Sequence, residues 1–208
     1  LDELGLAKST MVIFTSDNGG LSTSEGWPTS NLPLRGGKGW LYEGGIRDPL
    51  IILWPGVSKP GSIVAEPVIS PDFFATIAKA CDAPAPKHRD GVNLTRALRG
   101  SDSPGRALYW HYPHYGNQGG APGSAIREGN WKLIEWLEEG QLELYNLAED
   151  LGEKNNVAAA NPEVVSRLKS KLDAWRQDVG AKMPARNPAY DSAKPDGRES
   201  KRPAEKTK

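Results

Sequence analysis

The 208-residue sequence has one cysteine, no excess of charge of either sign and no long apolar run. Cys81 cannot form an internal disulfide, and we expect a small buried thiol on an apolar helical face with Phe73 and Ile77 rather than a nucleophile. The formal net charge of zero gives no reason to expect nucleic acid or an anionic membrane as a partner. Because no run approaches the ~18 apolar residues of a spanning helix, no membrane span is expected.

The start of the sequence predicts that the chain begins partway through a structural element. The first residue is leucine rather than methionine, and Leu1 to Leu4 do not form a signal peptide. Leu1 and Leu4 instead have the spacing of a helix face that ends at Gly5. We therefore expect a fragment, whose missing N-terminal segment is a partner of this chain. The 23 glycines and 17 prolines place much of what remains in loops.

Two short apolar runs, residues 12–14 and 50–54, are rich in β-branched residues and bounded by turn residues. Such continuous runs are typical of central strands covered on both faces, and we assign both to one sheet. The segment between them has no clear helical or strand period, but several large apolar side chains indicate that it packs. A packed irregular loop at a strand end is a common position for a binding site.

Two helices are predicted from their start signals and spacing. The first begins at Ser70-Pro71-Asp72, with the Ser70 hydroxyl as N-cap, and we expect it to cover one face of the sheet. The second begins at Asn161-Pro162-Glu163 and ends at Gly180. Its apolar positions repeat at helical spacing: Val164, Leu168, Leu172, Trp175 and Val179.

The pattern of apolar and aromatic residues changes at residue 107. Short alternating or aromatic runs predict a small antiparallel sheet with strands at residues 108–112, 124–127, 131–136 and 142–145. After Arg186 there is no Val, Ile, Leu, Met, Phe or Trp, so this tail cannot bury enough apolar surface to order itself. The predicted division is an α/β sheet domain at residues 1–105, a small sheet and helix subdomain at 106–185 and a flexible tail at 186–208.

Asp17 and Asn18 follow the first predicted strand directly. One offers an anionic oxygen and the other a neutral oxygen, which suits a hard cation such as Ca²⁺ or Mg²⁺. The alternative is a plain turn, because Asp-Asn-Gly-Gly is favourable turn chemistry by itself. Calcium needs about six to eight oxygens, and no second acidic cluster is arranged to complete the shell. Further ligands would have to come from outside the chain.

Lys38 lies among glycines, where the backbone can approach a ligand closely and a flexible ammonium can meet an oxyanion. The alternative is an exposed lysine on a flexible loop. The spacing is neither that of a phosphate-binding P-loop nor that of a dinucleotide fingerprint. Lys38 therefore predicts an anion contact only in combination with other motifs.

Two of the three histidines, His111 and His114, share an aromatic segment next to Gly116. Aromatic faces suit sugar rings and imidazoles can bind hydroxyl groups, so both are candidate substrate contacts, with His114 the stronger. The alternative is an ordinary strand with a packed aromatic edge, since isolated histidines are often structural.

Several blocks, spread over roughly residues 1–190, closely resemble the C-terminal half of the type I, arylsulfatase-like sulfatases. The blocks that carry the likeness are TSDNGG at 15–20, LRGGKGWLYEGGIRDP at 34–49, WPG at 54–56, SPD at 70–72, DGVNL at 90–94, AIREGNWKL at 125–133 and ELYNLAED at 143–150. The long second block makes chance similarity very improbable.

The resemblance implies a fold and a site. Residues 1–105 would be the distal part of an alkaline-phosphatase-like sheet domain, with Asp17 and Asn18 as two calcium ligands and Lys38 in contact with the sulfate group. Glu43 and Arg47 would form a structural ion pair that braces the loop. The family's formylglycine nucleophile arises within a Cys/Ser-x-Pro/Ala-x-Arg motif, which the sequence around Cys81 does not fit. It is therefore expected upstream.

The implied activity is hydrolysis of sulfate esters, on an aryl sulfate or a sulfated carbohydrate, in a periplasmic or secreted protein. The isolated chain would be inactive without its nucleophile. Two alternatives remain open: a phosphodiesterase or phosphonate hydrolase of the same superfamily, and a non-catalytic binding or structural module.

Overall fold

The computed structural model describes residues 1–23, 29–84, 90–101 and 105–188. Its centre is an antiparallel sheet with the strand order β3-β4-β5-β6. The strands are β3 (Ala107–Tyr112), β4 (Gly123–Glu128), β5 (Trp131–Trp136) and β6 (Leu142–Asn146). All four strands predicted from the sequence are confirmed, because the alternation of side chains and the Gly129 and Gly140 turns define a meander.

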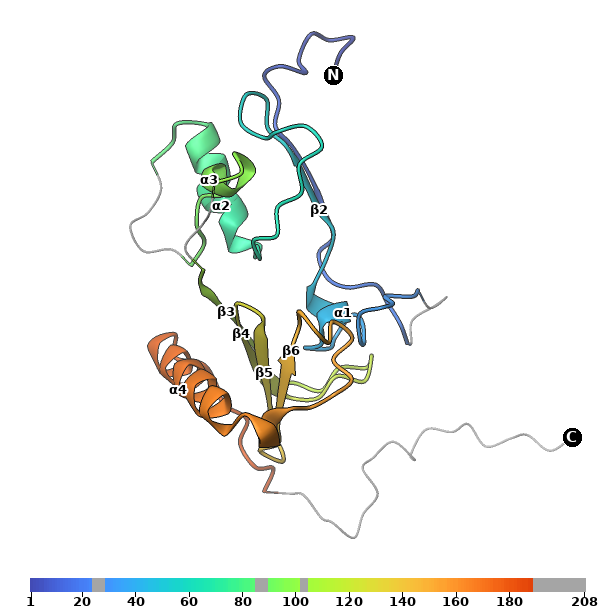
Figure 1. Ribbon diagram of the computed structural model, residues 1–208, viewed down its shortest axis with the longest axis vertical. Helices are drawn as coiled ribbons and strands as arrows, with labels where there is room; N and C mark the ends of the chain where they lie inside the picture. Colours follow the sequence, from blue (N-terminus) through green and yellow to red (C-terminus); the bar gives the residue numbers. More distant parts are fainter. Residues whose placement is uncertain (24–28, 85–89, 102–104, 189–208) are drawn as a thin grey trace, which may run out of the picture.

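Both faces of this sheet are covered. Ile126, Leu133 and Leu144 lie opposite one another in the register and pack against α4 (Pro162–Asp178), where they bury Leu168 and Leu172 completely. The other face presents Ala125, Ile134 and Tyr145 to Leu41 and Tyr42 of the glycine-rich loop, residues 34–42, which carries Lys38. The lower half of the molecule therefore has three layers, with the loop and α4 on opposite sides of the sheet (Figure 1).

The predicted C-terminal helix is confirmed as α4, although its start is stabilised differently from expectation. The Asn161 side chain makes no capping bond to the helix and instead donates to the carbonyl of Val157 at 2.9 Å. Gly180 has a φ of 61°, which is the left-handed conformation expected of a glycine just beyond a helix end. Trp175 stacks on Tyr109 of β3 with ring centroids 4.9 Å apart, which fixes the helix over the sheet.

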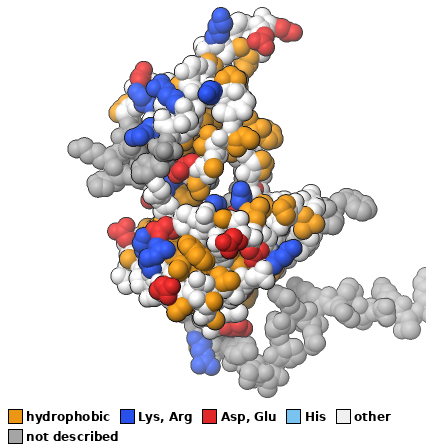
Figure 2. Space-filling model, in the orientation of Figure 1, with side chains coloured by type: hydrophobic (Ala, Val, Ile, Leu, Met, Phe, Trp, Pro, Cys, Tyr) orange, Lys and Arg blue, Asp and Glu red, His pale blue; other side chains and the backbone are white. Residues whose placement is uncertain are grey.

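The two apolar runs near the start form an antiparallel ribbon of β1 (Val12–Thr15) and β2 (Leu50–Leu53). The prediction that they share a sheet is confirmed. The expectation that both faces are covered is wrong for this structure, because Phe14 and Ile51 are 60% and 64% exposed. These two residues are direct cross-strand partners, and hydrophobic side chains gather over the ribbon (Figure 2).

The helix after the ribbon, α2 (Pro71–Ala80), starts where predicted but turns a different face inward. Its buried positions are Asp72, Ala75, Thr76 and Ala78, whereas Phe74 and Ile77 are exposed. The predicted covering of the sheet by its aromatic face is therefore not observed. Cys81, predicted to be buried with this face, is exposed at the C-cap.

Asp72 replaces Ser70 as the side chain that stabilises the start of α2. The Ser70 hydroxyl makes no capping bond, while the Asp72 carboxylate accepts the backbone N–H groups of Ile69 at 2.9 Å and Val92 at 2.8 Å. The same carboxylate pairs with Arg106. This buried aspartate joins α2 to the segment before α3 (Thr95–Leu98).

Within the described ranges, no helix is long and apolar enough to cross a membrane. The predicted flexible tail at residues 186–208 lies almost wholly outside the described residues, which end at residue 188.

Candidate functional site

The loop after β1 presents the predicted metal ligands. Asp17 is exposed and Asn18 is half-buried. The next residue, Gly19, is buried and donates its N–H to the carbonyl of Gly45 at 3.0 Å. A Cβ on Gly19 would lie 1.8 Å from the carbonyl oxygen of Gly44, so only glycine fits here. This contact fixes the loop against α1 (Glu43–Ile46).

The glycine-rich loop brings Lys38 to the same place. The backbone N–H of Lys38 donates to the carbonyl of Gly20 at 3.1 Å. Asn31 bridges the two loops, since its amide oxygen accepts the Gly20 N–H at 3.1 Å and its amide nitrogen donates to the carbonyls of Gly20 and Gly36 at 2.8 and 3.1 Å. The structure thus unites the two segments in which the sequence placed Asp17, Asn18 and Lys38.

A second carboxylate, which the sequence analysis missed as a site residue, lies beside Asp17. The pKa of Asp48, just before β2, is raised by burial and by the negative charge of Asp17. Two neighbouring carboxylates and an amide oxygen are a donor set that suits a hard divalent cation. The described residues contain no group of three or more His, Cys, Asp or Glu side chains able to hold a metal. The donors fit part of a calcium site.

The loop between β3 and β4 packs directly on the residues after Lys38. Trp40 donates its indole N–H to the carbonyl of Gln118 at 3.0 Å. A Cβ on Gly120 would lie 1.8 Å from the carbonyl oxygen of Gly39, so the two backbones touch with no room for a side chain. The C-terminal sheet therefore contributes its β3–β4 loop to the surroundings of Lys38.

The two candidate histidines differ in their environment. Both ring nitrogens of His111 are engaged, one with the Ser124 hydroxyl at 2.8 Å and the other with the carbonyl of Lys182 at 2.9 Å. His114 is exposed and meets the ring of Tyr112 edge to face, 5.3 Å between centroids. His111 therefore serves internal packing, while His114 presents its imidazole at the surface of the β3–β4 loop.

The predicted ion pair between Glu43 and Arg47 is present at 3.6 Å, but it is not the principal contact of Glu43. Glu43 is 1% exposed and accepts a bond from the ammonium of Lys132 at 2.9 Å. Lys132 also pairs with Glu153 at 2.8 Å. Neither Lys132 nor Glu153 was singled out from the sequence, because nothing in a strand or turn pattern marks a buried charge.

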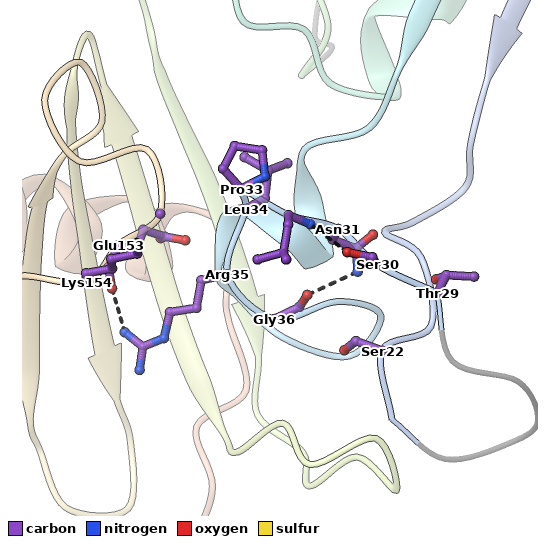
Figure 3. Close-up of a pocket in the computed structure, with 12 residues that line it drawn as sticks. Ser22, Thr29, Ser30, Asn31, Pro33, Leu34, Arg35, Gly36, Glu153 and Lys154 are labelled. Atoms are coloured by element: carbon purple, nitrogen blue, oxygen red, sulfur yellow. Dashed lines mark hydrogen bonds between the residues drawn. The ribbon is translucent and has the colours of Figure 1, made fainter.

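A pocket of about 670 Å³ lies beside the glycine-rich loop, between Asn31 to Gly36 and the turn at Gly152 to Lys154 (Figure 3). The Arg35 guanidinium points away from Thr29 and donates to the carbonyl of Glu153 at 2.8 Å. Arg35 also lies 3.8 Å from the centre of the Tyr42 ring. The Arg35 side chain therefore holds the loop on the sheet. Neither Lys38 nor Asp17 lines this pocket.

The chain matches a known protein-family model over most of its length. The model of the C-terminal region of N-sulphoglucosamine sulphohydrolase matches residues 37–178, which include the Lys38 loop and the whole C-terminal sheet. A sulfatase of Formosa agariphila is 40% identical over 190 residues, which cover 82% of this chain and 34% of that protein. Human arylsulfatase A is 33% identical over 196 residues, covering 81% and 38%. The chain thus spans about a third of the length of these curated relatives.

Solved structures give the same result. A structure described as Ps i-CgsB in complex with k-i-k-neocarrahexaose has a TM-score of 0.74 at 28% identity, covering 86% of this chain and 39% of that one. A protein bound to its substrate D-glucosamine-2-N,6-O-disulfate also has a TM-score of 0.74, at 26% identity, with 88% and 37% covered. The α/β arrangement expected from the sequence, an alkaline-phosphatase-like part followed by a small antiparallel sheet and helix, is confirmed.

Proposed function

Since the chain belongs to the sulfatase family, whose C-terminal region it matches, we propose that it is part of a sulfuric ester hydrolase to which it contributes Lys38, Asp17 and Asn18. The observation that carries this proposal is the bond from the Lys38 N–H to the Gly20 carbonyl at 3.1 Å. It holds a cation-bearing loop next to an oxygen-ligand loop. Hydrolysis of a sulfate ester requires positive charge from both loops, from the lysine of one and a metal ion held by the other, because negative charge builds up on the sulfuryl oxygens during the reaction.

In this proposal Lys38 places its ammonium on a sulfuryl oxygen and stabilises the charge that develops there. Asp17 and Asn18 would hold Ca²⁺, with Mg²⁺ as the alternative, and a bound ion would supply Lewis-acid stabilisation of the developing negative charge. Asp48 lies close enough to Asp17 to add negative charge to the site. The formylglycine nucleophile is proposed to lie in an upstream part of the same protein. The isolated chain is therefore expected to be inactive.

The substrate is proposed to be a sulfated saccharide or an aryl sulfate. His114 is the candidate contact to a substrate hydroxyl, because it is exposed on the loop that packs beside Lys38. His111 is the weaker candidate, since both its ring nitrogens are engaged within the chain. A carbohydrate substrate agrees with the ligands bound in the two solved relatives, a neocarrahexaose and a disulfated glucosamine.

The partner of the exposed ribbon is proposed to be the N-terminal segment of the same protein. Phe14 and Ile51 present a contiguous apolar surface on β1 and β2, and curated relatives are about three times longer than the matched part. We also propose a periplasmic or secreted location, on the family resemblance.

This proposal is tested by measuring the turnover of a chromogenic aryl sulfate and of sulfated disaccharides by the full-length parent protein. Lys38→Ala and Asp17→Ala are each expected to lower kcat/KM by a factor of roughly 100 or more, while Lys59→Ala, an exposed lysine of another loop, leaves it unchanged. Undiminished turnover by the Lys38 and Asp17 variants would remove both residues from the site. Faster cleavage of a phosphonate monoester than of any sulfate ester would favour the alternative activity; one fold relative is a phosphonate monoester hydrolase.

A further inference from the structure

Lys132 is a fully buried charge on the central strand β5, on the face of the sheet that meets the glycine-rich loop. Its ammonium lies 2.9 Å from one carboxylate oxygen of Glu43 and 2.8 Å from one of Glu153. Both carboxylates are buried. Arg127 approaches the second oxygen of Glu43 at 3.6 Å. One lysine therefore joins two acids from segments far apart in the chain.

Stability alone is a weak explanation for this arrangement. Removing charges from water costs several kcal/mol per ion, and apolar residues of similar volume often replace a buried pair without loss of stability. Burial accordingly raises the pKa of Glu153, against the opposing effect of Lys132. What the cluster does provide is a fixed connection, because one buried ammonium contacts carboxylates from two segments far apart in the chain at 2.9 and 2.8 Å.

That geometry is passed on to both loops of the proposed site through α1. Glu43 is the first residue of α1, and its backbone N–H donates to Glu153 at 2.6 Å. The next residue, Gly44, donates its N–H to the carbonyl of Arg35 at 2.8 Å, which holds the loop that carries Lys38. Gly45 accepts the N–H of Gly19, which holds the loop that carries Asp17.

These contacts hold the backbone of α1 in close packing with both loops. A Cβ on Gly44 would lie 2.5 Å from the carbonyl of Arg35, and one on Gly45 would lie 2.5 Å from the carbonyl of Gly37. Backbones packed so closely move together. A displacement of Glu43 would therefore shift the Lys38 loop and the Asp17 loop in the same step.

We propose that Lys132 is a positioning residue for the site, acting from the C-terminal sheet through Glu43 to set where Lys38 and Asp17 stand relative to each other. This inference rests on the proposed function. It adds to that function a role for the C-terminal sheet beyond shaping the surroundings of Lys38, and a residue that no motif of the site contains.

The test uses the full-length parent protein with Lys132→Met, which keeps the length of the side chain and removes its charge. Misplacement of reacting groups by about 1 Å can cost on the order of 100-fold in rate, so kcat is expected to fall by roughly that factor. Calcium affinity of the metal-free protein, measured by calorimetry, is expected to fall with it, because Asp17 is displaced as well.

A compensated variant separates positioning from simple destabilisation. Lys132→Met combined with Glu153→Gln removes one buried negative charge together with the lysine, and the glutamine oxygen can still accept the Glu43 N–H. The melting temperature is expected to recover while kcat stays at least ~10-fold below the parent value. Recovery of kcat in parallel with the melting temperature would overturn the proposal and leave Lys132 a purely structural residue.

Lys169 provides the matched control, because it also sits between two carboxylates, Glu135 at 3.4 Å and Asp173 at 2.6 Å, but on the α4 face of the sheet. Lys169→Met is expected to change neither kcat nor calcium affinity. If the parent protein cleaves no sulfate ester, the proposed function fails. The calcium titration still tests the inference, and equal affinity in the parent and the Lys132 variant would refute it.

Discussion

The backbone N–H of Lys38 donates to the carbonyl of Gly20 at 3.1 Å, so the cation and the oxygen ligands of the proposed site are linked through main chain rather than through mobile side chains. Charge stabilisation in a reaction is most effective when the stabilising groups are already in position. The glycines around both residues allow the two backbones to approach this closely. Asn31, which lies in neither of the two segments it joins, completes the link.

Asn31→Ala is expected to loosen this link. The variant loses three side-chain bonds, to the N–H and carbonyl of Gly20 and to the carbonyl of Gly36. The Gly20 carbonyl keeps its bond from the Lys38 N–H, but the Gly20 N–H and the Gly36 carbonyl, both part-buried, lose the Asn31 side chain as a partner. The loss of such bonds costs about 1–3 kcal/mol, and we expect a loss of this size in the free energy of unfolding of the isolated chain by urea titration. Asn155→Ala is the control, because the bond of this exposed residue to Asp150 uses the backbone N–H, which alanine retains. Equal stability of the two variants would contradict the prediction.

The sequence predicted best where one face of an element is buried within the chain itself. The four strands of the C-terminal sheet and α4 were correct, because their apolar periods reflect contacts such as Leu168 on Leu133 that exist inside this chain. The face of α2 and the burial of Cys81 were wrong. There, Phe74 and Ile77 are apolar but exposed in the described structure, so composition alone could not show which face turns inward.

The site shows the same division. Local chemistry, a strand end and a glycine-rich loop, marked the segments that hold Asp17, Asn18 and Lys38 as candidates, and the family resemblance gave these residues their predicted roles. Lys132 was not marked in this way, because a lysine on a strand is usually solvated and only the packing of the glycine-rich loop over β5 buries it. The domain division at residue 105 stays a prediction, and the family match that starts at residue 37 runs across it.

Calcium binding to the isolated chain is expected to be weak. Asp17 and Asn18, with Asp48 nearby, supply fewer than the about six to eight oxygens of a calcium site. Calorimetry should give a dissociation constant above ~1 mM, and Asp17→Asn should remove the remaining heat. Asp82→Asn, a change at an exposed carboxylate, should not. Tight one-to-one binding by the isolated chain would show that its own residues complete the site.

Stability at high pH should depend on two buried tyrosines. Tyr42 and Tyr145 both donate to one oxygen of Glu143, at 3.0 and 2.9 Å. Burial raises the pKa of each phenol well above its usual range, and the charge of Glu143 adds to the shift. The folded state therefore holds these protons more tightly than the unfolded state, whose phenols titrate near pH ~10.

This difference in proton binding sets the direction in which stability changes with pH. The contribution of each tyrosine is fully present below pH ~10 and is lost as the pH rises from there toward the raised pKa of the folded state. Urea unfolding of Tyr145→Phe between pH ~9 and ~11 should show a shallower loss of stability than the parent chain. Trp136→Phe, a change in the same cluster without a titrating group, should lower stability at every pH and leave the slope unchanged. An unaltered slope in Tyr145→Phe would place its phenol in contact with water.

Polar substitutions in the exposed ribbon should raise the solubility of the isolated chain and lower the stability of the full-length protein. Changing the cross-strand pair Phe14 and Ile51 to serine removes apolar surface that the isolated chain exposes, so its soluble, monomeric concentration should rise in sedimentation experiments. In the full-length parent the same change should cost about 1.5–3 kcal/mol for each side chain in the free energy of unfolding, because the N-terminal segment is proposed to bury both. Ile63→Ser is the control, since Ile63 is 97% exposed and lies outside the ribbon, and its effect on the full-length protein should stay within about 0.5 kcal/mol. A ribbon variant that leaves the stability of the full-length protein unchanged would mean that this surface faces solvent there too, and the N-terminal segment would have to dock elsewhere.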